Sequence, residues 1–229
     1  MTESNPWEWQ DDKQDQPLIS NRVLDLSFCM QGDKIQVDHT KALSEGVSSH
    51  LPWLIDESLA GLHLIHVAGS QNGWMRPESP DALLYLSRRT RLVIRIPVSR
   101  MADAQALVGQ TLDINGEVIK VGEAREKPIT VSEVLIARHV VSPQEREEDF
   151  LRQVLKVFGE LQIRSKTLLA GRTLSLEAPG GSVQTRSLMV ANLKPEDSLR
   201  LQEEGMGEGR HFGCGVFIHH KGIAKVSTQ

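Results

Sequence analysis

The chain has 229 residues, 39% of them hydrophobic, and a net charge of −4 from 26 basic and 30 acidic residues. This length suits one large domain or two units of roughly 100 residues each, and the net charge excludes a protein that binds polyanions over its whole surface. Cys29 and Cys214 lack ligand spacing, so we expect neither a disulfide framework nor structural zinc. Because the sequence shows no signal peptide and no long apolar run, we expect a cytoplasmic protein without membrane contact.

The first 20 residues are acidic and lack a periodic pattern, with five acidic residues against Lys13 alone. Such a composition is typical of a flexible tail. Trp7 and Trp9 offer anchors to the body or to a partner, but we favour an ordinary tail in which they are incidental.

Residues 21–130 alternate strand and helix patterns. Alternating apolar residues indicate strands, Asp38 and Pro52 bound a helix, and the Asn115-Gly116 pair is the strongest short hairpin signal. The expected elements are a strand at 22–30, a helix at 39–51, strands at 61–67 and within 82–97, a short helix at 99–108 and a hairpin at 111–122.

The second half of the chain repeats this order. Ser142, Pro143 and Glu145 combine a capping serine, a first-turn proline and a capping-box glutamate, so they predict the start of a helix that runs to Gly159. The other expected elements are strands at 134–141, 167–177, 183–193 and 216–220, and a short helix from Pro195 to Gly205.

Each half therefore approximates strand–helix–strand–strand–helix–strand. This order predicts an α+β fold of two tandem ferredoxin-like (RRM-like, βαββαβ) units, one at residues 21–130 and one at 131–229, after the tail at 1–20. The fold hosts many unrelated functions, so function has to be argued from particular residues.

A glycine-rich loop, GMGEGRHFGCGVF at residues 205–217, precedes the last predicted strand. Glycine allows left-handed backbone angles and close approach to a ligand, and successive amides there can bind an anion. Arg210 adds a guanidinium suited to phosphate. A helix C-cap and a β-bulge would explain one or two of these glycines. On the residues alone, we favour contact with a polyanion.

The segment EDSLRLQEEGMGEGRHFGCGVFIHHK closely resembles the C-terminal signature of the CRISPR-associated endoribonucleases that cut repeat RNA into guide RNAs, members of the RAMP superfamily. VDHTKAL, HLPWL, GLHLIHV and SRRTRLVIRIP resemble one branch of that family, and the resemblance covers about residues 22–221. It implies two ferredoxin-like units and metal-independent cleavage by attack of the ribose 2′-hydroxyl, without a cofactor. The implied partners are the repeat RNA hairpin and other subunits of a CRISPR effector (Cascade) complex.

The resemblance places the catalytic histidine in or beside the first helix, which leaves His39 and His50. Histidine suits both proton transfers of such a reaction. We rank His39 first because the VDH…LPW arrangement matches this branch of the family. We keep His50 as the second candidate because in some relatives the histidine falls later in this helix, although a helical face shared with Leu43 would also explain it as a partly buried residue. His63 is a possible second proton carrier. His211 lies inside the loop, and we expect RNA contact or no role for it rather than catalysis.

RNA contacts are expected from the glycines of the loop and from basic residues, which meet the backbone of an A-form stem. The expected RNA-binding residues are Gly205, Gly207, Gly209, Arg210, Gly213, Gly215, Arg88, Arg89, Arg91, Arg95 and Lys221. Two other functions remain open: a non-catalytic RAMP subunit that only holds the hairpin, and an unrelated enzyme with a phosphate-containing ligand.

Overall fold

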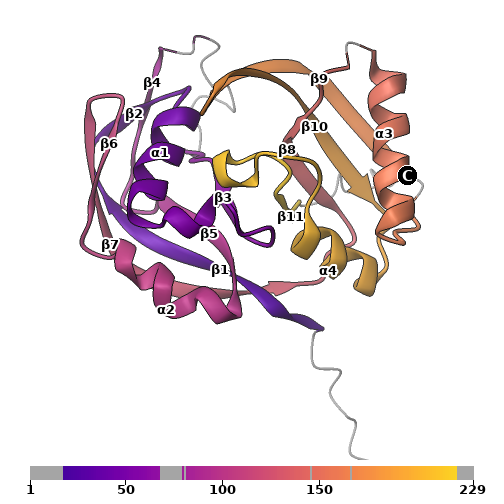
Figure 1. Ribbon diagram of the computed structural model, residues 1–229, viewed down its shortest axis with the longest axis horizontal. Coiled ribbons are helices and arrows are strands. Elements are labelled where there is room, and N and C mark those ends of the chain that lie inside the picture. The colour runs from indigo at the N-terminus through magenta and orange to yellow at the C-terminus, as the bar shows by residue number, and fades with distance from the viewer. Residues whose placement is uncertain (1–17, 68–78, 80, 145, 166, 221–229) are drawn as a thin grey trace, which may run out of the picture.

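The computed structural model describes residues 18–67, 79, 81–144, 146–165 and 167–220. Its elements fall into two groups along the chain (Figure 1). The first group comprises β1 (Ile19–Gln31), β2 (Lys34–Gln36), α1 (Thr40–His50), η1 (Pro52–Leu54), β3 (Gly61–His63), β4 (Leu83–Tyr85), β5 (Arg91–Pro97), η2 (Val98–Arg100), α2 (Met101–Ala104), η3 (Gln105–Leu107), β6 (Thr111–Ile114) and β7 (Glu117–Thr130). The second comprises β8 (Leu135–Val141), α3 (Glu147–Glu160), β9 (Thr167–Ala178), β10 (Gly181–Ala191), α4 (Pro195–Glu204), η4 (Arg210–Phe212) and β11 (Phe217–His219).

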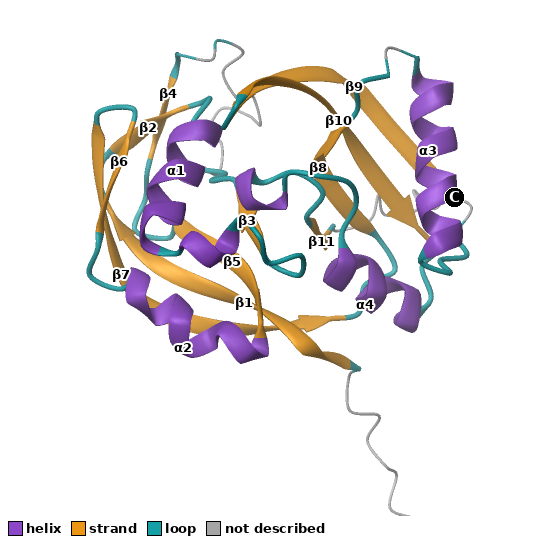
Figure 2. Ribbon diagram, in the orientation of Figure 1, coloured by secondary structure: helices purple, strands orange, loops and turns teal. Residues whose placement is uncertain are grey.

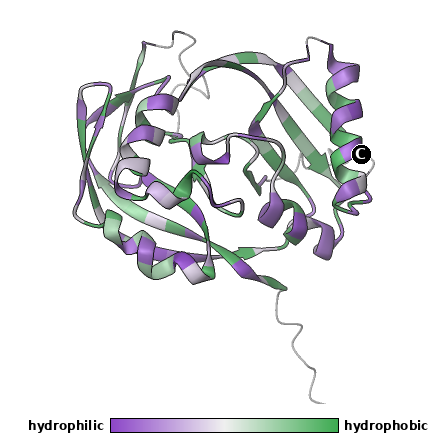
Figure 3. Ribbon diagram, in the orientation of Figure 1, coloured by the Kyte–Doolittle hydropathy of each residue, from purple (hydrophilic) through white to green (hydrophobic). Residues whose placement is uncertain are grey.

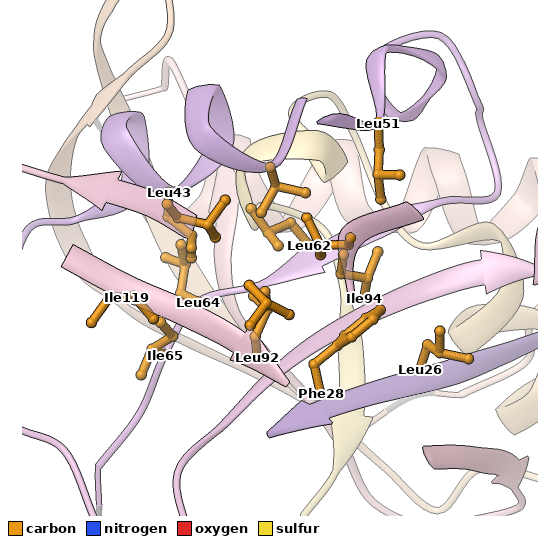
Figure 4. Packing of buried hydrophobic residues seen from close by; sticks show 14 of the residues in the cluster. Leu26, Phe28, Leu43, Leu51, Leu62, Leu64, Ile65, Leu92, Ile94 and Ile119 are labelled. Atoms are coloured by element: carbon orange, nitrogen blue, oxygen red, sulfur yellow. The ribbon is translucent and has the colours of Figure 1, made fainter. Parts of the chain in front are cut away.

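The first unit is built on a five-stranded antiparallel sheet of order β3-β5-β1-β7-β6. Strand β1 lies at its centre, where Phe28 is opposite Leu92 of β5. Figure 4 shows these two side chains with Leu62 of β3 and Leu43 of α1 in one buried cluster. Each large apolar side chain buried in this way contributes about 1.5–3 kcal/mol. Helix α1 is thereby fixed against one face of the sheet.

The second unit has a four-stranded sheet of order β11-β8-β10-β9. Helix α3 packs on it through Phe150, Val154 and Phe158, which recur at helical spacing and are buried with residues of β8 and β10. In both units the order of strands is second, third, first, fourth, which is the ferredoxin-like order. The predicted fold of two tandem ferredoxin-like units is therefore confirmed, and the chain passes between the sheets from Thr130 to Leu135 (Figure 2).

Some element boundaries differ from the sequence predictions. Helix α3 begins at Glu147, after an uncapped Arg146, and Ser142 Oγ instead lies 3.4 Å from Oε1 of Gln144. Acidic residues at 147–149 occupy the first turn, where the helix dipole favours them. Strand β3 ends at His63 rather than at residue 67, and residues 98–107 alternate short 3₁₀ and α turns.

Helix α4 connects the two units with polar side chains. It is largely hydrophilic in Figure 3, yet Ser198, Gln202 and Glu203 are buried. Ser198 Oγ accepts the amide of Ser132, and Gln202 Nε2 donates to the carbonyl of Thr130. Buried polar groups of this kind need partners, and here the partners come from the segment that joins the sheets. The junction between the units therefore combines specific hydrogen bonds with a small apolar cluster, in which Leu199 of α4 is buried with Val23 and Ile129 of the first unit.

Candidate functional site

The glycine loop begins at the C-terminus of α4 and returns to the first unit. In Figure 1 its 3₁₀ turn, η4, lies beside α1, and η4 contacts both α1 and β3. Ser44 of α1 donates its hydroxyl to the carbonyl of His211 at 3.0 Å. Gly209 and Gly213 bound η4 with φ angles of 82° and 94°, which favour glycine. The loop is thus held in one conformation against the first helix.

The amides of the loop bond mainly within the protein. Met206 N donates to Gly215 O at 3.0 Å, Gly215 N donates to His139 O at 2.7 Å, and Cys214 N donates to Gly209 O at 3.0 Å. A Cβ atom on Gly205 would lie 2.5 Å from Gly215 O, so the two ends of the loop cross where only glycine fits. Gly205 and Gly215 are buried, Gly209 and Gly213 are half-buried and Gly207 is exposed. Crossing and hydrogen bonding within the protein account for Gly205 and Gly215, while Gly207 remains open to a ligand.

Arg210 is buried at 8% exposure and binds backbone of both units. Its Nε donates to Ala60 O at 3.0 Å, Nη2 to Leu59 O at 3.1 Å and Nη1 to Glu203 O at 2.8 Å. Burial and the neighbouring charge of Arg95 lower the pKa of Arg210 to about 10, so the guanidinium is still charged at neutral pH. Three of its five N–H donors serve carbonyls, which argues against a direct contact with phosphate, and the predicted RNA contact of Arg210 stays a prediction.

Arg95 makes the reciprocal contact from the first unit and is 1% exposed. Nε and Nη2 bind the carboxylate of Asp25 at 2.8 and 3.1 Å, while Nη1 donates to Gln202 O and Phe217 O of the second unit. Burial alone would raise the pKa of Asp25, but the charges of His63 and Arg95 lower it well below its usual range. This burial argues against contact between Arg95 and RNA, and that predicted role stays a prediction.

His63 belongs to this junction. Its Nε2 lies 3.4 Å from Oδ1 of Asp25, and its side chain is 16% exposed. The ring therefore faces a carboxylate that Arg95 already neutralises. This position is compatible with a proton carrier at the rim of the junction.

The remaining predicted arginines lie in the turn before β5. Arg88 and Arg89 are exposed, and Arg91 Nη1 donates to the carbonyls of Arg88 and Thr90 at 2.6 and 2.8 Å. Arg91 thus holds the turn that presents its two neighbours to solvent. Lys221 lies outside the described residues.

His39 is a buried part of the backbone framework, with an exposure of 1%. Its Nδ1 lies 2.9 Å from Gln36 O and 3.0 Å from Val37 O, and its Nε2 accepts the amide of Ile65 at 3.0 Å. Since carbonyls only accept and an amide only donates, the ring is neutral with its proton on Nδ1. Both nitrogens are bonded to backbone in this structure, which argues against His39 as the base, and its catalytic role stays a prediction.

His50 is half-buried in the last turn of α1. It follows Ser44 by six residues, so the two side chains are roughly 120° apart around the helix. Ser44 faces η4. His50 therefore projects from a different side of α1 than the side that contacts the loop.

His211, by contrast, is half-buried within η4 itself. Burial lowers the pKa of its imidazole, and the carboxylate of Asp56 opposes that shift. The ring packs edge-on against the buried Phe212, with centroids 4.9 Å apart. The sequence places this histidine in the loop but does not show that η4 fixes it beside α1.

No three His, Cys, Asp or Glu side chains in the described part of the chain are grouped in a way that could hold a metal ion. Burial raises the pKa of the Cys214 thiol to about 12. None of the described helices is long and apolar enough to cross a membrane.

A family model described as Cas6 Crispr matches residues 24–222. The CRISPR-associated endonuclease Cas6 of Myxococcus xanthus (strain DK1622) is 30% identical over 207 residues, which cover 90% of this chain and 85% of that protein.

Solved structures share the fold at low sequence identity. A CRISPR associated protein Cas6 superposes with a TM-score of 0.57 at 11% identity, covering 87% of this chain and 100% of that one. A RAMP protein described as binding different RNA substrates gives a TM-score of 0.52 at 12% identity, with coverages of 86% and 98%. A Cas6-related protein from Pyrococcus furiosus gives 0.53 at 10% identity, with coverages of 86% and 98%. At these identities the likeness supports the fold alone.

Proposed function

The chain belongs to the Cas6 family of CRISPR repeat-processing endoribonucleases, and we propose that it cuts CRISPR repeat RNA into guide RNAs without a metal ion. In this reaction the ribose 2′-hydroxyl attacks the adjacent phosphate. The O2′–P bond forms, the P–O5′ bond breaks, and a cyclic phosphate and a 5′-hydroxyl result. A base accepts the proton of the 2′-hydroxyl and an acid protonates the leaving O5′.

The observation that carries this proposal is the presence of half-buried histidines on elements that meet at the glycine loop. His50 lies on α1, His63 on β3 and His211 on η4, and η4 contacts both of the other elements. Imidazole can accept and donate protons near neutral pH, so side chains of this kind can serve both steps without a metal. We keep His50 and His63 as candidates for these proton transfers.

RNA binding is assigned to the exposed basic turn and the open part of the loop. Arg88 and Arg89 can neutralise phosphates of an A-form stem, while Gly207 leaves the backbone accessible. Lys221 keeps its predicted role as an RNA contact.

We also propose that the product hairpin stays bound and that the protein joins an effector complex. A cleft of about 470 Å³ lies at the start of β1 and the ends of α3 and α4. It is lined by Glu160, Glu196, Glu203 and Glu204 against Arg22 and Arg200. An acidic surface repels RNA, so this cleft suits a protein partner better than a second stretch of nucleic acid.

The test uses the full chain and repeat RNA in buffer with EDTA. We expect one discrete cut that leaves a cyclic phosphate and that disappears when the nucleotide before the cut carries a 2′-deoxyribose. With RNA in excess, retention of the product appears as a burst equal to the protein concentration. A requirement for divalent metal, or cleavage of the 2′-deoxy RNA, would overturn the mechanism. Tight binding without any cleavage would select the non-catalytic RNA-binding subunit.

A further inference from the structure

The described histidines differ in how far their rings are already engaged by partners within the protein. His39 is bonded to backbone through both nitrogens, and His63 faces Asp25 in the junction. His139 is buried with Nδ1 3.2 Å from Thr185 Oγ1, and Nδ1 of His219 lies 2.7 Å from Ser132 Oγ. Each of these four rings already faces a partner within the protein. A histidine that takes up a proton from RNA needs a ring that is fixed in place and still open at an edge.

His211 meets both requirements. Its backbone is fixed because Phe212 N and Cys214 N both donate to Gly209 O at 3.0 Å, and because its own carbonyl accepts Ser44 Oγ. The neighbours of His211 on either side, Arg210 and Phe212, are buried as anchors. The side chain of His211 is half-buried, and no hydrogen bond joins its ring to another described residue.

We propose that His211 is a catalytic residue of the RNA cleavage and acts as the general base on the ribose 2′-hydroxyl. This assignment rests on the proposed function. One ring nitrogen takes the 2′-proton as the O2′–P bond forms, and the O5′ released from phosphorus takes a proton from solvent. The loop would then hold the scissile phosphate against a base that it carries itself.

The electrostatic surroundings of the ring agree with this role. Burial lowers the pKa of His211, so the ring is neutral and able to accept a proton at pH 7. The carboxylate of Asp56 stabilises the charge that the ring gains when it does so. On α1 the charged residue nearest to Ser44 around the helix is Lys41, three residues earlier. On β3 the titratable residue is His63, which is directed to Asp25.

The test compares His211→Ala with His219→Ala, a change to an exposed histidine in the last strand. Under single-turnover conditions we expect His211→Ala to cleave repeat RNA 10²–10⁴-fold more slowly, roughly the contribution of a general base. Its dissociation constant for the hairpin should change less than about threefold, because the loop backbone is unaltered. His219→Ala should match wild type in both measurements.

Two further readouts separate catalysis from a structural role. Wild-type cleavage should fall with decreasing pH along a limb centred below 6.5, and this limb should be absent from His211→Ala. Added imidazole should restore part of the lost rate. His211→Gln, which retains the size of the side chain, repeats the test if the alanine variant does not fold.

Several results would overturn this assignment. Cleavage by either variant within fivefold of wild type would do so, as would a loss of rate that is matched by an equal loss of affinity. These outcomes leave the proposed function intact when the wild-type protein cleaves repeat RNA in EDTA. If the wild-type protein itself does not cleave, the proposed function and this assignment fail together.

Discussion

The arginines of the turn before β5 and the arginine within that strand lie fewer than ten residues apart but in opposite environments. Arg88 and Arg89 lie exposed in the turn before β5, whereas Arg95, on the strand itself, is buried against Asp25 and two carbonyls of the second unit. Charge density in the sequence does not separate the two. The difference arises because the second unit covers one face of β5. Arg95 on that face therefore bonds the two units together, whereas Arg88 and Arg89 in the turn remain accessible to RNA.

The largest effect should follow from removing the buried member. Arg95→Ala leaves the carboxylate of Asp25 in the junction without its guanidinium and leaves Gln202 O and Phe217 O without a donor. We expect the free energy of unfolding to fall by about 3–5 kcal/mol, as for other broken buried pairs. Urea denaturation measures it, and Arg88→Ala is the matched control, which should stay within about 0.5 kcal/mol of wild type. Equal stability of the two variants would contradict the contrast between the turn and the junction.

The next effect concerns His39, which immediately precedes α1. His39→Ala removes the acceptor of the Ile65 amide and leaves a buried cavity, so the free energy of unfolding should fall by about 2–4 kcal/mol. The cleavage rate of the folded fraction should stay within about threefold of wild type, because His39 meets backbone rather than RNA. Denaturation curves combined with single-turnover cleavage below the transition measure both quantities. A large loss of rate in a fully folded His39→Ala protein would restore it as the base.

Substitutions in the exposed turn before β5 should change the stability least, and they should change the binding of the RNA hairpin. Arg88→Ala with Arg89→Ala should leave unfolding nearly unchanged and weaken hairpin binding. The slope of log K against log salt concentration falls in magnitude by about 0.7–0.9 for each phosphate contact that is lost. The double variant should therefore show a slope that is smaller in magnitude by about 1–2. Binding titrations over a range of salt concentrations measure the slope, with Arg152→Ala on α3 as an exposed control. An unchanged slope would place the RNA elsewhere.

Local signals in the sequence predict the elements well where short-range physics decides. The Asn115-Gly116 pair forms its hairpin turn with φ angles of 55° and 84°, and Pro195 and Gly205 bound α4. The order of strands and helices in both halves is enough to predict two ferredoxin-like units. At Ser142 the capping signal competes with the acidic first turn of α3, and the helix begins later.

The site is less predictable because its contacts are distant in sequence. His39 is bonded to Ile65, 26 residues later, and Arg210 reaches Ala60 across 150 residues. Alternation along β5 correctly places Arg95 away from the apolar cluster, but it cannot show that another unit covers that face. The glycine pattern predicts phosphate binding for the whole loop, whereas Gly205 and Gly215 lie where its two ends cross in the structure. A pattern of residue types thus identifies the loop without dividing its residues between folding and binding.

The reciprocal arginines also bear on how the protein is made. Arg210 donates hydrogen bonds to the carbonyls of Leu59 and Ala60 in the first unit. In turn, Arg95 of the first unit donates to the carbonyls of Gln202 and Phe217 in the second. All three of these second-unit residues follow the first unit in the chain, so they are synthesised after it. Until then the guanidinium of Arg95 and the carbonyls of Leu59 and Ala60 lack these partners. Incomplete domains of this kind are prone to misassembly. Synthesis of residues 202–217 therefore supplies partners to polar groups of both units at once, and a chain that stops before residue 202 leaves those groups of the first unit without them.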